Sequence, residues 1–220
     1  RKENAIEQKQ SLLKDVETLD SLKLNIIPHH SRRLVSLQDV SVSYGEHPVL
    51  EHFSLEVSQG ERIALSGKNG CGKSSLIRLI LGDDIPHTGE VWTPSGLRIS
   101  YISQDTSRLG GTLDEYASEH DLDNAVFRTV LRKLGLERSQ FGKQIQDYSE
   151  GQKKKVLLAG SLCEPAHLFL WDEPLNFIDV FSRIQIEELL LSARPSMIFV
   201  EHDRAFREKV ASRIVRIRCS

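Results

Sequence analysis

The sequence predicts an α/β fold, in which a mostly parallel β-sheet is covered by helices on both faces and carries an antiparallel edge and a helical insertion. Short apolar strands alternate with helical patterns through the last third of the chain. A glycine-rich segment, GKNGCGKSS at residues 67–75, stands directly between an apolar strand and a helix. With 220 residues, 39% of them hydrophobic, the chain can bury one substantial core.

An amphipathic helix is expected before the sheet, at residues 1–24. Its apolar residues recur at steps of three and four: Leu12, Val16, Leu19 and Leu22. Such a helix is more stable against a partner than alone. Residues 25–33 form a connector. Because the first residue is Arg and the only methionine is Met197, we expect the chain to be part of a longer protein.

The remaining elements follow from hydrophobic periodicity and turn residues. Alternating patterns predict strands at 34–44, 52–59, 62–67, 89–93 and 97–104. Helical patterns follow at 74–82, ending at Gly82, and at 113–120 and 124–135. The last third predicts a helix from residue 150, then a strand at 167–174, a helix at 180–191, a strand at 197–203, a helix at 204–210 and a strand at 213–218.

Charge and composition limit the classes of partner. Lys and Arg number 29 against 31 Asp and Glu, so the net charge of -2 gives no basic excess that favours nucleic acid or an anionic membrane. The apolar stretches are shorter than the roughly 20 residues that cross a bilayer, so we expect no membrane segment in this chain. Three scattered cysteines (Cys71, Cys163 and Cys219) fit neither a disulfide framework nor a zinc cluster and indicate a reducing cytoplasm.

Residues 67–74 carry G-x-x-x-x-G-K-S, the P-loop pattern, in the strand-to-helix context that it requires. Its glycines let backbone N–H groups approach phosphate oxygens, Lys73 is placed against the β- and γ-phosphates, and the Ser74 hydroxyl can ligate Mg²⁺. The residues expected at the nucleotide are Gly67, Asn69, Gly70, Cys71, Gly72, Lys73, Ser74 and Ser75. For the Cys71 side chain itself we favour a packing role. The pattern predicts a P-loop NTPase core that binds a nucleoside triphosphate.

Two acidic residues follow the apolar strand HLFLW, at the carboxyl end where open α/β sheets bind their ligands. We expect Asp172 to support the metal and Glu173 to position and polarise the attacking water. The alternative is that Asp172 caps a helix and Glu173 is solvated. The presence of Lys73 in a P-loop makes this alternative less favoured.

Three further side chains are weaker candidates. His202 follows another apolar strand and can hydrogen-bond a γ-phosphate or the water beside it, although a lone histidine there is more often structural. Gln104 ends a strand, and its amide oxygen can ligate Mg²⁺ or remain a solvated loop group. Tyr44 offers a flat face on which adenine can stack or which simply packs.

The segment YSEGQ at 148–152 opens a helix whose first backbone N–H groups suit an anion. Because this start lies beyond a helical insertion, it is better placed to grip a nucleotide on another copy than one at Lys73 of its own chain. The run Lys153, Lys154 and Lys155 can touch RNA, but a solvated helix face is the favoured interpretation.

The order of these motifs over residues 34–218 resembles an ABC-type ATPase nucleotide-binding domain. The resemblance implies that ATP and Mg²⁺ are sandwiched between the P-loop of one domain and the signature of a second, with Ser149, Gly151 and Gln152 serving the partner's site. Asp179, in the segment LNFID, would lie in the D-loop at the seam. Gln104, Ser74 and Asp172 are the implied metal ligands, and Glu173 and His202 the catalytic pair.

The continuation VEHDRAF and the charged N-terminal segment are similar to the second half of an ABC-F protein of the Lsa/Vga kind. That resemblance implies a linker end at residues 1–33, an ATPase domain at 34–220 with a helical subdomain inserted at about 105–162, and a second ATPase domain as partner. It also implies action on the ribosome, through the full linker, against lincosamide, pleuromutilin or streptogramin A drugs.

The signature departs from the common family form LSGGQ, since Tyr148 replaces Leu and Glu150 replaces Gly. Glu150 is expected to bring negative charge near the phosphate. Two other classes remain: the ATPase subunit of an ABC membrane transporter, and a chromosome-maintenance ATPase of the SMC type. HDRAF and the lack of an apolar span disfavour the first, and the short insertion between Gln104 and Ser149 disfavours the second.

Overall fold

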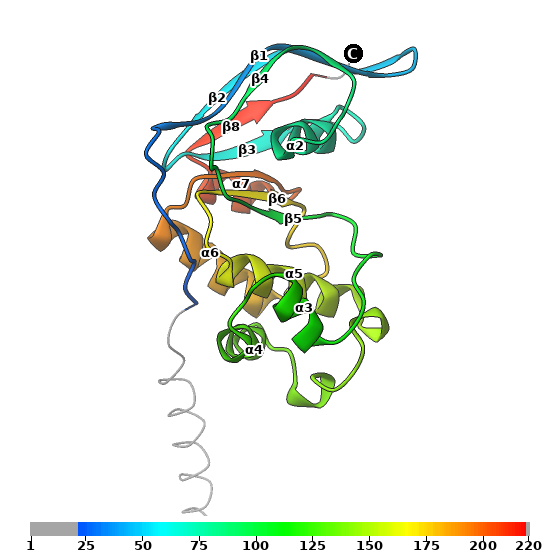
Figure 1. Cartoon of the computed structure of the whole chain (residues 1–220), viewed down its shortest axis with the longest axis vertical. Coiled ribbons are helices and arrows are strands. Elements are labelled where there is room, and N and C mark those ends of the chain that lie inside the picture. Colours follow the sequence, from blue (N-terminus) through cyan, green and yellow to red (C-terminus); the bar gives the residue numbers. More distant parts are fainter. Residues whose placement is uncertain (1–21, 219–220) are drawn as a thin grey trace, which may run out of the picture.

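A five-stranded parallel sheet forms the centre of the computed structural model, which describes residues 22–218 (Figure 1). The strand order is β5-β6-β7-β3-β8. Their bounds are β3 Arg62–Ser66, β5 Ile99–Ile102, β6 Leu168–Asp172, β7 Met197–Val200 and β8 Arg213–Arg216. In the register, Ile63 of β3 lies opposite Ile198 of β7. The predicted α/β class with a parallel sheet is confirmed.

The antiparallel strands form a sheet of their own instead of an edge of the parallel one. Its order is β2-β1-β4, with β1 at Arg33–Tyr44, β2 at His47–Ser58 and β4 at His87–Trp92. β1 pairs antiparallel with both neighbours and has β-bulges in each ladder, which bend long strands. Figure 1 shows this sheet stacked above the parallel sheet with α2, Lys73–Leu81, beside it.

Alternation along the buried strands divides the apolar side chains between two cores. Ile63, Leu65 and Ile198 point to the core shared with the antiparallel sheet and α2. Ala64 and Phe199 point to the opposite core, which contains the other helices. Because successive side chains of a strand face opposite sides, a strand buried on both faces is expected to be apolar, as β7 is throughout and β6 is up to its last residue, Asp172.

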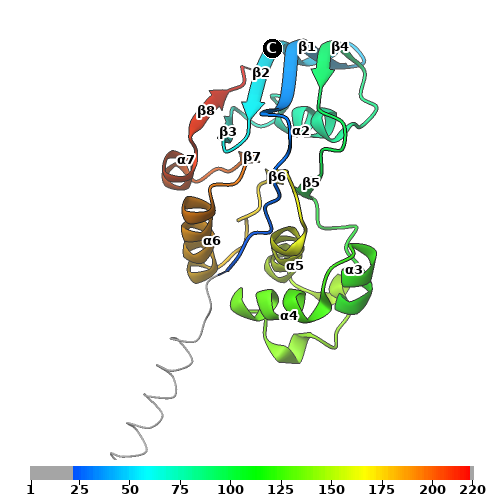
Figure 2. The ribbon, with the colours of Figure 1, turned by 60° about the vertical axis from the view of Figure 1, so that its left-hand side comes forward.

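Helices cover the lower face of the parallel sheet in Figures 1 and 2. They are α3 Leu113–Glu119, α4 Asn124–Lys133, α5 Glu150–Cys163, α6 Val180–Ala193 and α7 Arg204–Val210, with 3-10 turns η1 Arg138–Gln140 and η2 Ile145–Asp147. Most begin at a capping side chain, such as Thr112 before α3 and Asp123 before α4. Figure 2 shows α3 and α4 farthest from the antiparallel sheet, as expected of an inserted helical segment.

The amphipathic helix predicted at residues 1–24 lies almost entirely outside the described residues. From Leu22 the chain runs as a connector along the edge of the α5–β6 junction, where the Asn25 N–H donates to Leu162 O at 3.2 Å and Ile26 bridges to Ala166. The connector expected at residues 25–33 is therefore confirmed up to β1.

Candidate functional site: a nucleotide pocket at the carboxyl edge of the parallel sheet

The loop between β3 and α2 has the backbone of a phosphate cradle. Gly70 and Gly72 adopt φ of 81° and 86°, a left-handed conformation that side chains disfavour. A Cβ on Gly72 would also lie 2.8 Å from Val49 O, so only glycine fits. The Lys73 ammonium curls back into this loop and donates to Gly67 O at 3.0 Å and to Lys68 O at 2.8 Å. The cradle thus holds a buried cation whose present partners are neutral carbonyls.

Ser74 and Asp172 meet at the end of β6. The Ser74 hydroxyl donates to Asp172 Oδ2 at 2.8 Å. Asp172 is buried, and burial raises the pKa of its carboxyl, with the nearby Glu173 acting in the same direction against the Ser74 hydrogen bond and two lysines. The Asp172 carboxylate, which is costly to ionise, and the Ser74 hydroxyl beside it are suitable oxygen ligands for a divalent cation.

Glu173 is held by three donors from three different loops. Its Oε1 accepts from His202 Nε2 at 2.8 Å, and its Oε2 accepts from Gln104 Nε2 at 3.1 Å and from Asn176 Nδ2 at 2.6 Å. Its φ of 51° is unusual for a residue other than glycine. The structure thus brings the three predicted residues Glu173, Gln104 and His202 together. Because the Gln104 nitrogen donates to Glu173, its amide oxygen is the atom left for a cation.

These groups surround an open pocket of about 450 Å³. Tyr44 borders it from the end of β1, is 44% exposed, and shares a hydrogen bond with Ser75 Oγ at 3.1 Å. The lining residues are Tyr44, Val49, Asn69, Gly70, Gly72, Lys73, Ser74, Ser75, Gln104, Glu173 and His202. Of the residues expected at the nucleotide, Gly67, Cys71 and Asp172 are not among them, and Asp172 lies behind Ser74, which does line the pocket. The Cys71 side chain is buried with its Sγ 3.9 Å from Lys73 Nζ, which agrees with the packing role favoured for it.

The predicted signature residues are also absent from this lining. Ser149 caps α5, with its Oγ accepting from Gln152 N at 3.3 Å while Gln152 Oε1 accepts from Ser149 N at 3.0 Å. A Cβ on Gly151 would lie 2.5 Å from Phe177 O, so this glycine is required by packing within the chain. Asp179 caps α6 and pairs with Lys155 at 2.7 Å. Against the effect of burial, hydrogen bonds from Lys155 and Ser182 hold the pKa of Asp179 at about 2.

The prediction that Lys153, Lys154 and Lys155 form a solvated helix face is wrong. Lys154 is 2% exposed, and its ammonium donates to Ser103 O at 2.8 Å and Gln104 O at 3.0 Å. The other two are paired, Lys153 with Glu150 at 3.3 Å and Lys155 with Asp179. Lys154 and Lys155 reach neighbouring loops through their long stems, and Lys153 pairs within the helix, so hydrophobic periodicity does not reveal where these ammonium groups lie.

Sequence reasoning missed two groups at the site, Asn176 and Lys154. Asn176 is three residues after Glu173 in a loop and carries no periodic signal. Lys154 was hidden in a run of identical residues. A partial signal exists for Asn176, since Asn and Asp near a strand end commonly bond to their own turn.

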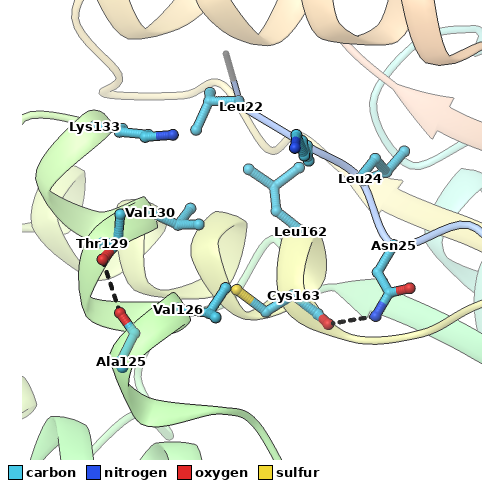
Figure 3. Close-up of a pocket in the computed structure, with 11 residues that line it drawn as sticks. Leu22, Leu24, Asn25, Ala125, Val126, Thr129, Val130, Lys133, Leu162 and Cys163 are labelled. Carbon is cyan, nitrogen blue, oxygen red and sulfur yellow. Dashed lines mark hydrogen bonds between the residues drawn. The ribbon is translucent and has the colours of Figure 1, made fainter. Parts of the chain in front are cut away.

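A second pocket, of about 650 Å³, lies away from these groups between the connector and the helical segment (Figure 3). Leu22, Leu24, Val130 and Leu162 are among the residues that line it. Cys163 lies near its floor, and burial raises the pKa of this thiol to about 11. Such a thiol stays protonated and unreactive at neutral pH.

Together the fold and the pocket define a P-loop domain that binds a nucleoside triphosphate. The chain belongs to the ABC transporter family, whose profile matches residues 50–176, and is an ATPase domain of it. Relatives include the "ATP-binding protein Uup" of Buchnera aphidicola, 26% identical over 97% of this chain and 37% of the relative. The "Ribosome protection protein VmlR" of Bacillus subtilis is 30% identical over 82% of this chain and 34% of the relative.

The fold agrees with solved structures of the same family. A dimeric structure of a bacterial ABC transporter cassette superposes with a TM-score of 0.72 at 21% identity, over 84% of this chain and 94% of that one. The chain spans about a third of the length of the curated relatives it matches. Among residues 22–218, no helix is long and apolar enough to cross a membrane.

Proposed function

We propose that the chain is an ATP-binding and ATP-hydrolysing domain that acts only when paired with a second ABC ATPase domain. One observation carries this proposal. The pocket formed by Lys73, Ser74 and Glu173 lacks Ser149 and Gly151 from its lining, although these residues form a capped helix start suited to an anion. ABC domains work as dimers or paired domains, so each domain would supply this helix start to the other's pocket.

Within its own pocket, the chain's residues fit ATP and Mg²⁺. The P-loop amides and Lys73 would bind the β- and γ-phosphates, and Tyr44 would border the adenine. Ser74, Asp172 and Gln104 supply oxygen ligands of the type that Mg²⁺ prefers, and the cation would neutralise charge on the phosphates. On binding, Lys73 would exchange two neutral carbonyls for charged phosphate oxygens, which is a favourable exchange for a buried ammonium.

Glu173 and His202 would carry the hydrolytic step. The Glu173 carboxylate would accept a hydrogen bond from the attacking water, whose oxygen bonds to the γ-phosphorus as the bond to the β–γ bridging oxygen breaks. The products are ADP and inorganic phosphate, and the proton released from the water passes to phosphate or solvent. The donors from Gln104, Asn176 and His202 fix the Glu173 carboxylate in place.

An apolar stripe beside the signature turn supports pairing. Phe177, Val180, Phe181 and Ile184 are 76%, 72%, 61% and 50% exposed. Phe177 lies in the loop before α6, and Val180, Phe181 and Ile184 share one face of the first turns of that helix. The stripe begins where Phe177 O packs against Gly151, so it continues from the edge that would face the second domain. An exposed apolar stripe of this size is typical of an interaction surface.

We further propose that the complete protein is a cytoplasmic ABC-F protein that acts on the ribosome, with the linker ending at residue 33 and the ATPase domain at 34–220. The support is the 30% identity with the ribosome protection protein VmlR from Bacillus subtilis. Resistance to lincosamide, pleuromutilin or streptogramin A drugs is the corresponding phenotype.

Ribosome co-sedimentation of the full-length protein tests this second proposal. A Glu173→Gln variant, with the equivalent change in the other ATPase domain, should bind ATP without turnover and sediment with ribosomes when ATP is present but not with ADP. The matched control is Lys73→Ala on the same background, which should not sediment. Association with membranes instead of ribosomes would favour a transporter subunit and contradict the proposal.

A further inference from the structure

We propose that Glu150 is a positioning residue, which with Lys154 ties the signature turn to the loop that carries Gln104. This inference rests on the proposed function. It connects the chain's own pocket, through Gln104, to the start of α5 that would serve the second domain. It also replaces the expectation that the Glu150 charge lies near the phosphate.

The first step is the direction of the Glu150 side chain. Its Oε2 accepts a short hydrogen bond from the hydroxyl of Thr106, which is 4% exposed, and its Oε1 pairs with Lys153 at 3.3 Å. The Thr106 hydrogen bond, then that from Lys153, lowers the pKa of the Glu150 carboxyl. Both oxygens are therefore occupied within the chain, and the carboxylate is stable as an anion at neutral pH.

The second step is the contact that Lys154, one helical turn after Glu150, makes with the same loop. Residues four apart share a face of a helix, so Glu150 and Lys154 both face the loop at 103–106. Lys154 donates there to the carbonyls of Ser103 and Gln104. Burial lowers the pKa of Lys154, while the negative charges of Asp172, Glu173 and Glu150 oppose this effect. A buried ammonium on two carbonyls is a stiff contact, because the alternative is an unpaired buried charge.

The loop itself is internally braced, so it transmits displacement as a unit. Asp105 Oδ1 accepts from Ser107 N at 2.8 Å, and Leu109 N donates to Thr106 O at 3.1 Å. The same loop presents the Gln104 amide to Glu173 at 3.1 Å. A shift of Gln104 when nucleotide and metal bind would therefore move the first turn of α5, and with it Ser149 and Gly151.

Amide hydrogen exchange on this chain tests the tie without requiring turnover. Glu150→Gly removes both Glu150 contacts, and we expect exchange at residues 103–109 to rise by roughly threefold to tenfold, the factor of one lost hydrogen bond. Thr106→Val should produce the same change at 103–109, and the double variant no more than either single one, because both variants remove the same Thr106–Glu150 hydrogen bond. Glu150→Gln keeps an oxygen that accepts from Thr106 and should stay near wild type. Unchanged exchange in Glu150→Gly would overturn the proposal.

The transmitted response is measured with Mg²⁺ and a non-hydrolysable ATP analogue. In the wild type, the analogue should slow exchange at both 103–109 and 148–152. In Glu150→Gly, where the Lys154 contacts remain, the slowing at 103–109 should be kept and that at 148–152 should be at least halved. The control is Glu119→Gln, an exposed glutamate of α3 outside these contacts. In the paired protein, Glu150→Gly should lower kcat with little change in KM, with rescue by Gln. Faster turnover in both Glu150 variants would contradict the proposal, because it would show that the Glu150 charge repels the phosphate. Failure of the wild-type pair to hydrolyse ATP would contradict the proposed function, but it would not affect the hydrogen-exchange test of the Glu150 contact.

Discussion

Asp172 beside the nucleotide pocket and the carboxylates around the signature turn differ in how far the chain itself satisfies them. Burial raises the pKa of Asp172, and among residues 22–218 its side-chain donor is the Ser74 hydroxyl, whereas its neighbour Glu173 has three donors. Around the signature turn, Thr106 and Lys153 lower the pKa of Glu150, and against the effect of burial Lys155 and Ser182 hold that of Asp179 at about 2. The comparison indicates that the Asp172 end of β6 is suited to a cation, whereas the carboxylates around the signature turn already have their partners within the chain.

The largest expected effect is on ATP affinity, which should depend on the pocket and not on the signature turn of the same chain. Lys73→Ala should weaken ATP binding to the unpaired chain by roughly a hundredfold, because a buried charged contact to phosphate is lost. Ser149→Ala should leave that affinity within about twofold and lose turnover of the pair. Titration calorimetry at low protein concentration measures the first quantity. Equal losses of affinity in both variants would mean that one chain encloses its own nucleotide.

Glu173→Gln addresses the chemical step at the pocket. Turnover should fall by roughly a hundredfold or more, as for loss of a general base, while ATP affinity is kept. Pairs should then accumulate with ATP, as seen by analytical ultracentrifugation. Turnover that survives this change, or that does not depend on protein concentration, is incompatible with the assigned role.

Phe181→Asp addresses the apolar stripe beside the signature turn. On the Glu173→Gln background it should weaken ATP-dependent pairing by roughly tenfold to a hundredfold, since a charge would replace an aromatic side chain that pairing would bury. Val126→Asp is the matched control, because Val126 is 51% exposed on α4 away from the stripe. Equal effects of the two changes on pairing would remove the stripe from the interface.

The smallest expected effect is on thermal stability, and it compares Asp172 with Asp179. The raised pKa of Asp172 means that ionisation costs the folded state, so Asp172→Asn should raise Tm at pH 7 without Mg²⁺ by roughly 2–4 °C. The gain should vanish below about pH 4, where Asp172 is protonated in both states. Asp179→Asn should instead lower Tm at pH 7, with the difference fading as pH falls from about 4 towards 2. Thermal unfolding followed by circular dichroism measures both, and a stabilising Asp179→Asn would contradict the comparison.

The sequence predicts the parallel core well because each buried strand is a continuous apolar run ending in a polar group at one edge. The P-loop, Asp172, Glu173 and His202 are local motifs at strand ends, so strand order alone brings them together. Contacts made by long side chains between loops are not local. Lys154 contacts the Gln104 carbonyl and Glu150 contacts Thr106, and both pairs are more than forty residues apart in the sequence. Hydrophobic periodicity does not predict such contacts.

The close approach of Gly151 to the carbonyl of Phe177 affects how ABC domains can be interpreted across a lineage. A domain that had lost the ability to split ATP would still be held to glycine at this position, since any larger residue would push the loop after β6 out of place. Retention of this glycine in a relative is therefore poor evidence that the relative is a working enzyme.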